Sequence, residues 1–208
     1  MIELLTADTP NGKKISIMLE EINFNYKVTK VNIFKDEQFK PEFKKISPFS
    51  KTPVIIDHET EESLFETGAI LIYLAEKSGK FYNKKYRTKI NQWLIGQVAY
   101  VGPMLGQHHQ FHYYNSGKSK FGEERYFKIS KRIYKELDER LSVSNYLAGE
   151  DYTIADIATF PWIARHEWHD IGLKNFKNLT RWYKEISKRD AVKKGYDLLK
   201  NGDKVPEV

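Results

Sequence analysis

The sequence of 208 residues predicts an α/β domain followed by an all-α domain. In the first 80 residues, short apolar runs typical of β-strands alternate with stretches in which apolar residues recur at helical spacing. From residue 81 onward the pattern is helical, and the charge balance changes with it. Residues 1–80 hold 11 basic and 13 acidic side chains, whereas the remainder holds 23 and 15. We therefore expect one domain over residues 1–80 and a helical domain over residues 86–208.

The first domain is expected to run strand, helix, strand, and then strand, strand, helix. Strands joined through a helix are typically parallel, whereas the short acidic loop at 58–62 suits an antiparallel hairpin. The last helix is expected to end at Ser78 and Gly79. The expected strands are 2–6, 26–33, 53–57 and 63–65, and the expected helices are 12–23, 38–46 and 66–77.

The second domain carries apolar stripes and one clear helix start. Thr153 is placed as a helix N-cap with Asp156 three residues later, which is a capping box with aspartate in place of the usual glutamate. Tyr152 and Ile157 would pack together around that cap. The expected helices are 84–115, 121–143, 153–170, 178–188 and 190–200.

Composition narrows the possible chemistry. The chain has no cysteine, so it has no disulfide, no zinc–thiolate site and no thiol nucleophile of its own. Any thiol chemistry must therefore come from a bound small molecule. The net charge of +6 is spread over lysines that alternate with glutamates, a pattern that favours solvated helix faces over a nucleic-acid surface.

The location predicted from the sequence is cytoplasmic, without a membrane partner. The longest apolar stretches, such as residues 69–75, are far shorter than a membrane span. The first residues also lack the basic start and long apolar run of a signal peptide.

Lys51, Thr52 and Pro53 form the first candidate site motif. A proline that opens a strand between polar residues favours a tight turn, and its peptide bond can be cis. The backbone of Thr52 could then pair with an extended ligand as an added strand does. The alternative is a simple strand-start proline without a ligand.

Glu66 and Thr67 form the second motif, at the junction of a strand and a helix. The N–H groups at a helix N-terminus bind anions, and a threonine hydroxyl can add a bond to a carboxylate. Glu66 could meet an ammonium group, so the pair suits an α-amino acid. Helix capping alone explains the same residues equally well.

Thr9 and Asn11 form the third motif, at the mouth of the first helix. A thiolate placed there would be stabilised by the helix dipole and by hydroxyl or amide donors. Thr9-Pro10-Asn11-Gly12 is equally typical of a turn with an N-cap.

His108 and His112 are spaced by four on a predicted helix, as zinc ligands often are. No third ligand is evident beside them, although His109 and His166 are present. We therefore expect no metal site and interpret this segment as a polar, aromatic wall of a cleft or interface.

Five stretches of the sequence resemble the cytosolic glutathione transferase superfamily, and within it the bacterial nu class, which is related to the yeast nitrogen regulator. The stretches are TPNGKKISIMLEE, QFKPEFKKISPFSKTPVI, SLFETGAILIYLAEK, GPMLGQHHQF and YLAGEDYTIADIATFPW. The resemblance implies a thioredoxin-like N-terminal domain followed by an all-helical C-terminal domain. It also implies a homodimer that binds glutathione near the interface.

The resemblance assigns roles around the predicted glutathione site. Pro53 would follow a cis peptide bond, and the Thr52 backbone would pair with the cysteinyl part of glutathione. Glu66 and Thr67 would hold the γ-glutamyl end. Residues with less direct implied roles are Gln38 and Lys51 near the glycine carboxylate, Thr9 and Asn11 beside the sulfur, and Arg125 in an EERY segment that reaches the site.

Thr9 and Asn11 depart from many transferases, which use Tyr, Ser or Cys to activate the thiol. Thr and Asn can donate a hydrogen bond to a thiolate but do not act as bases. We therefore expect a glutathione-dependent disulfide-bond reductase with transferase activity, acting on a small-molecule disulfide or electrophile. The alternative is a module that binds glutathione for regulation with little turnover.

Overall fold

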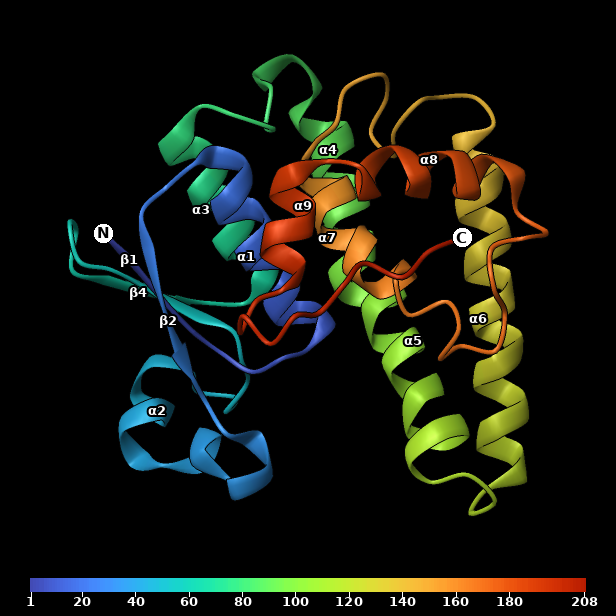
Figure 1. The fold of residues 1–208 in the computed structure, drawn as a ribbon, viewed down its shortest axis with the longest axis horizontal. Helices are drawn as coiled ribbons and strands as arrows, with labels where there is room; N and C mark the ends of the chain where they lie inside the picture. The colour runs from blue at the N-terminus through green and yellow to red at the C-terminus, as the bar shows by residue number, and fades with distance from the viewer. The chain divides into compact units, whose positions relative to one another are not determined.

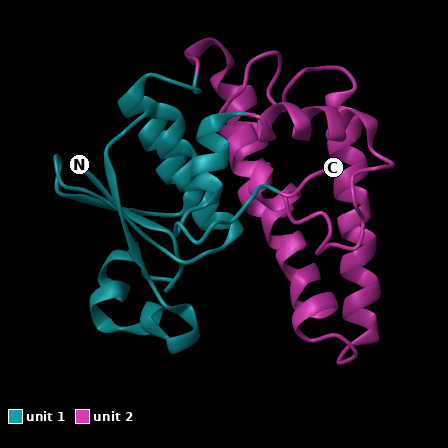
Figure 2. Ribbon diagram, in the orientation of Figure 1, with its two compact units in different colours: residues 1–82, 189–205 teal, residues 83–188, 206–208 magenta.

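The computed structural model describes residues 1–208, which form two compact units, coloured separately in Figure 2. Unit 1 comprises residues 1–82 together with 189–205, and unit 2 comprises residues 83–188 together with 206–208. The architecture is a thioredoxin-like sheet domain joined to a helical domain, as predicted. No helix has both the length and the apolar character that crossing a membrane requires.

Unit 1 is built on one mixed sheet (Figure 1). Its strand order is β2-β1-β3-β4. β1 pairs in parallel with β2 and antiparallel with β3, while β3 and β4 form the antiparallel hairpin. These pairings confirm the predicted parallel pair and hairpin. The bounds are Ile2–Thr6 for β1, Tyr26–Lys30 for β2, Val54–Asp57 for β3 and Glu62–Phe65 for β4.

β2 ends before residue 33, where the predicted strand ended. The chain turns there through two 3₁₀ segments, η1 (Ile33–Lys35) and η2 (Glu37–Phe39). The Asn32 side chain accepts a bond from the Phe34 N–H, and the Asn32 N–H donates to the Glu37 carboxylate at 2.7 Å. These local hydrogen bonds give the backbone N–H groups of residues 32 and 34 partners outside the sheet, so they compete with continuation of the strand.

Three helices of unit 1 follow the predicted pattern. α1 (Pro10–Ile22) starts two residues earlier than predicted, because Thr9 caps it and Pro10 fits its first turn. α3 (Thr67–Ser78) ends at Gly79, whose φ of 70° places it in the left-handed region that glycine tolerates. The short helix α2 (Pro41–Ile46) packs Phe43 against Val31 and Val54 of the core.

α9 (Asp190–Tyr196) and the chain after it pack on α1, which corrects the expected second domain of residues 86–208. A Cβ on Gly195 would lie 2.5 Å from the Ile17 Cα, so the absence of a side chain lets the two helices approach closely. The Ser16 hydroxyl donates to the Gly195 carbonyl at 2.5 Å. Helical periodicity indicated a helix here but not the surface on which it packs.

Unit 2 is helical. A continuous helical stretch covers residues 87–114, with π-helical turns between and after its α-helical parts. The predicted helix 153–170 ends at residue 163, because the chain then passes into turns. The bounds are Arg87–Gly96 for α4, Gly102–His108 for α5, Lys120–Leu141 for α6, Ile154–Ile163 for α7 and Lys177–Ser187 for α8.

The predicted capping box of α7 is confirmed. Asp156 accepts bonds from the Thr153 N–H at 3.0 Å and from the Leu147 N–H at 2.9 Å. The Trp182 indole N–H of α8 donates to the same carboxylate at 2.9 Å. The cap therefore also ties a loop and a second helix to the start of α7.

Candidate functional site

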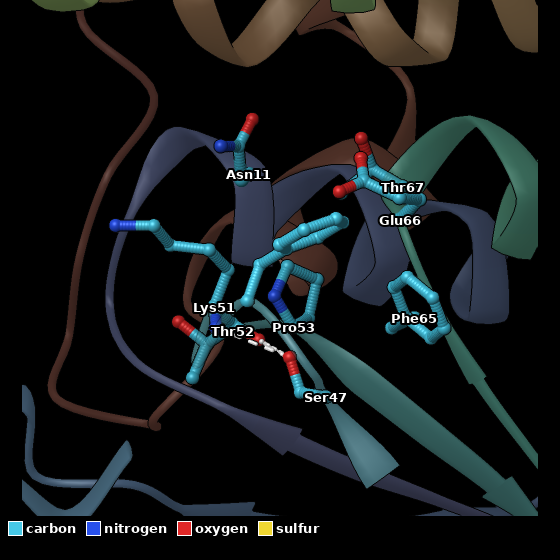
Figure 3. A pocket seen from close by; sticks show the side chains of 9 residues that line it. Asn11, Ser47, Lys51, Thr52, Pro53, Phe65, Glu66 and Thr67 are labelled. Atoms are coloured by element: carbon cyan, nitrogen blue, oxygen red, sulfur yellow. Dashed lines mark hydrogen bonds between the residues drawn. The ribbon is translucent and has the colours of Figure 1, made fainter. Parts of the chain in front are cut away.

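A pocket of about 140 Å³ opens in unit 1 where three chain segments meet (Figure 3). The segments are the first turn of α1, the loop before β3 and the junction of β4 with α3. The pocket is lined by Asn11, Ser47, Phe49, Lys51, Thr52, Pro53, Phe65, Glu66 and Thr67.

The loop before β3 is held in shape by the Ser47 hydroxyl. It accepts a bond from the Lys51 N–H at 3.1 Å and donates to the Lys51 carbonyl at 2.8 Å. The Thr52–Pro53 peptide bond is cis, as the family resemblance implied. Pro53 is buried while Lys51 is exposed. The loop therefore contributes both an apolar surface and a cationic side chain to the pocket.

The junction of β4 and α3 presents an acidic side chain and a helix N-terminus side by side. Glu66 has φ 68° and ψ 117°, a conformation that costs a non-glycine residue about 1–3 kcal/mol. Its side chain makes no capping bond to α3 and is exposed. Helix capping by the Glu66 carboxylate is therefore not its role, and the carboxylate is open to the pocket.

Opposite charges lie on opposite sides of the pocket. Figure 3 shows the Lys51 ammonium pointing away from the Glu66 carboxylate, with Pro53 between them. Thr67 is the first residue of α3, where the free N–H groups of the helix attract an anion. The arrangement suits an extended ligand with an α-amino acid at one end and a carboxylate at the other.

The first turn of α1 contributes Asn11 to the pocket wall, while Thr9 lies just outside the lining. The Thr9 hydroxyl accepts a bond from the Gly12 N–H at 3.1 Å and so caps the helix. A hydroxyl that accepts can still donate its hydrogen, so capping and a bond to a ligand are compatible.

Besides Thr9, the predicted site residues Gln38 and Arg125 do not line the pocket. Gln38 lies in η2, where its amide donates to the Ile33 carbonyl at 3.4 Å. Arg125 lies on α6 in unit 2, with its guanidinium 6.0 Å from the centroid of the Tyr126 ring. The roles of both residues stay predictions.

Sequence reasoning missed Ser47, Phe49 and Phe65, which also line the pocket. Phe49 and Phe65 meet edge to face with ring centroids 6.2 Å apart. Phe49 lies close to the motif at Lys51, and Phe65 directly precedes the motif at Glu66. This closeness in sequence was the one signal that could have identified the two phenylalanines. Their aromatic rings give the pocket an apolar wall.

The histidine-rich segment predicted as a polar, aromatic wall forms an aromatic cluster inside unit 2. The His108 and His112 rings stack with centroids 4.7 Å apart, and the His108 ring N–H donates to the His169 carbonyl at 2.9 Å. No group of three or more His, Cys, Asp or Glu side chains in the chain is placed to hold a metal ion. Packing thus explains the spacing of these histidines.

Comparison with known families identifies the class to which this fold and pocket belong. Residues 3–76 match the glutathione S-transferase N-terminal domain, and residues 104–190 match the glutathione S-transferase C-terminal domain. The chain belongs to the glutathione S-transferase family. It is 43% identical to the disulfide-bond oxidoreductase YfcG of Escherichia coli K12, over 96% of this chain and 95% of that protein.

Solved structures of similar proteins contain glutathione in reduced or oxidised form. A glutathione transferase homologue from Lodderomyces elongisporus, with two glutathione molecules per subunit, is 35% identical with a TM-score of 0.90 over 95% of this chain and 98% of that one. A glutathione transferase from Pseudomonas putida, with one glutathione disulfide per subunit, is 38% identical with a TM-score of 0.87 over 95% and 91%.

Proposed function

We propose that this protein is a glutathione-dependent disulfide-bond reductase of the nu class, with transferase activity. The observation that carries the proposal is a pocket in which the exposed carboxylate of Glu66 adjoins the first residue of α3, Thr67, and Lys51 lies on the opposite side, in a chain without cysteine. The similar proteins described above support glutathione as the ligand.

In this proposal each end of glutathione meets a complementary group. Glu66 binds the ammonium of the γ-glutamyl residue, and the Thr67 hydroxyl with the first N–H groups of α3 binds its carboxylate. The Thr52 backbone pairs with the cysteinyl residue, next to the cis Pro53. Lys51 faces the glycine carboxylate, and Gln38 is the second residue that we assign to this carboxylate.

Thr9 and Asn11 stabilise the thiolate in this proposal rather than generate it. Glutathione supplies the thiol, whose thiolate attacks one sulfur of a disulfide and displaces the other sulfur as a thiolate. Hydroxyl and amide donors with the α1 dipole stabilise negative charge on sulfur before and after the exchange. A second glutathione thiolate then resolves the mixed disulfide, and glutathione disulfide and the reduced thiol are the products.

The test is turnover of a small glutathione mixed disulfide by the purified protein. The Thr9→Ala, Asn11→Ala double variant should lose about a hundredfold in kcat, because it lacks both side-chain donors to sulfur. Thr9→Ala also removes the α1 cap and so costs about 1 kcal/mol of stability. Thr9→Ser keeps cap and donor and is the matched control.

The outcomes separate the proposed reductase from its alternative. Turnover no faster than the uncatalysed exchange would refute the reductase, and glutathione binding without turnover would favour a regulatory module.

The proposal also includes a cytoplasmic homodimer, for which sedimentation equilibrium should give twice the mass of the 24.5 kDa chain.

A further inference from the structure

Two adjacent buried lysines on α1 have different surroundings. Lys13, 2% exposed, is bound by Asp8 at 2.8 Å and Asp203 at 3.1 Å. Lys14, 1% exposed, lies toward the first turn of α3, with its ammonium nitrogen 3.3 Å from the Thr67 hydroxyl oxygen. Lys13 therefore ties α1 to the end of unit 1, whereas Lys14 places a positive charge behind the pocket.

The bond between Lys14 and Thr67 has one possible direction while Lys14 is charged. An ammonium group donates and does not accept, so the Thr67 oxygen must be the acceptor. The hydroxyl hydrogen of Thr67 is then directed away from Lys14. Since Thr67 lines the pocket, that hydrogen is available to a ligand there.

Lys14 also acts through its charge. Its burial prevents direct contact with a ligand, but the ammonium lies behind the N-terminus of α3, whose N–H groups already attract an anion. The Glu66 carboxylate is the acidic group that acts on it electrostatically, and Glu66 is exposed to the pocket. On α9, which also packs on α1, Asp190, Lys193 and Lys194 are exposed to solvent.

We propose that Lys14 is a positioning residue for the γ-glutamyl carboxylate of glutathione. Its ammonium fixes the Thr67 hydroxyl as a donor toward the pocket and adds positive charge behind the α3 N-terminus. This inference rests on the proposed function, because it concerns how the same pocket holds its ligand.

The role of Lys14 has a consequence for pH dependence. Burial lowers the pKa of Lys14 to about 7, although the nearby Glu66 carboxylate acts in the opposite direction. A bound carboxylate would stabilise the ammonium and raise that pKa, so binding is tightest where Lys14 is already charged. Affinity should therefore fall as pH rises above about 7. The neutral amine can moreover accept the Thr67 hydrogen, which withdraws the donor from the pocket.

The experiment measures binding of S-methylglutathione by calorimetry between about pH 6 and about pH 8, where this ligand has no thiol to titrate. The wild type should bind more weakly at the upper end. Lys14→Met should bind about tenfold more weakly at about pH 6 and show little pH dependence. Thr67→Val should weaken binding similarly, and the double variant should lose little more, because both substitutions remove the same bond.

Lys13→Met is the matched control, because it removes an equally buried ammonium from the same helix without facing Thr67. It should keep the wild-type affinity and pH dependence. If Lys14→Met does not fold, the wild-type protein decides the question by NMR. The ¹³Cε signal of Lys14 should then titrate with a higher pKa when S-methylglutathione is bound.

Two results would overturn the role of Lys14. One is a wild-type affinity that does not change with pH, and the other is an unchanged Lys14 pKa on binding. Additive effects of Lys14→Met and Thr67→Val would refute the route through Thr67. Failure of the wild type to bind S-methylglutathione at all would instead refute the proposed function, so the two failures are distinguishable.

Discussion

At the scale of single residues, Asp57 at the end of β3 joins the sheet to α3. Its fully buried carboxylate accepts bonds from the Lys77 ammonium at 2.6 Å and the Tyr73 hydroxyl at 2.7 Å. Burial by itself raises the pKa of Asp57, but these bonds outweigh it and lower that pKa to about 2. The ionised carboxylate is therefore part of the folded structure.

Asp57→Asn should lower the free energy of unfolding at neutral pH by about 2 kcal/mol, because it removes a buried charge-assisted network. In the wild type this stabilisation is present above about pH 4 and is lost as pH falls toward 2, since the folded pKa lies below the unfolded one. Urea titrations across that range should show a shallower acid loss in the variant.

Glu59→Gln is the control for this prediction. Glu59 also binds Lys77 at 2.6 Å but is 69% exposed, so its loss should change stability by less than about 0.5 kcal/mol. Equal losses of unfolding free energy in Asp57→Asn and Glu59→Gln would contradict the claim that burial makes the Asp57 interaction the stronger one.

Residue type alone predicted the site only in part. Pro53 stands out in the sequence, and the family resemblance implied its cis bond. The left-handed backbone of Glu66 was not predictable, because glutamate gives no signal for positive φ. That conformation depends on the meeting of β4 with α3, which is a tertiary feature.

At the scale of elements, the last residue of α5 and the first residue of the π-helical segment after it, His108 and His109, pack against the turn that follows α7. His109 stacks on His169 with ring centroids 4.6 Å apart, and the Tyr134 hydroxyl lies 2.6 Å from the His169 Nδ1 atom. Burial lowers the pKa of His109 to about 4, with Arg165, His108 and His112 acting in the same direction. Burial also holds the pKa of His169 well below its ordinary value.

This cluster predicts a loss of stability in mild acid. Below about pH 6.5 these histidines are protonated in the unfolded chain but stay neutral in the folded protein. The free energy of unfolding therefore falls as pH drops toward about 4. Each such histidine contributes at most about 1.4 kcal/mol per pH unit. His109→Phe should keep the ring stacking and make the decline shallower in urea titrations from about pH 7 to about pH 4. An unchanged slope would contradict the prediction.

At the scale of the whole molecule, the periodicity of apolar residues predicted the strands, most helices and the class of each unit. It did not predict that residues 189–205 belong with the first 82. Amphipathicity tells which face of a helix is buried but not what it is buried against. The contact between α9 and α1 depends on the absence of a side chain at Gly195. A single glycine is a weak signal in the sequence, although it decides how closely the two helices pack.

Gly195→Ala should therefore destabilise the protein by about 2 kcal/mol, because its Cβ would meet the Ile17 backbone and α9 would be pushed from α1. Gly96→Ala is the matched control within a helix, since nothing lies within 4 Å of a Cβ there. It should instead stabilise by about 0.5–1 kcal/mol. Thermal unfolding of both variants should show shifts of opposite sign.

The packing of α9 on α1 has a consequence for synthesis of the chain. Every residue that lines the pocket is made early, but the segment that packs against α1 is made only after residues 83–188 of unit 2. Folding in the order of translation therefore cannot complete unit 1 before unit 2, because α1 lacks its packing partner until residues 189–205 have been made. The pocket proposed to bind glutathione would then mature as one of the last events of biosynthesis.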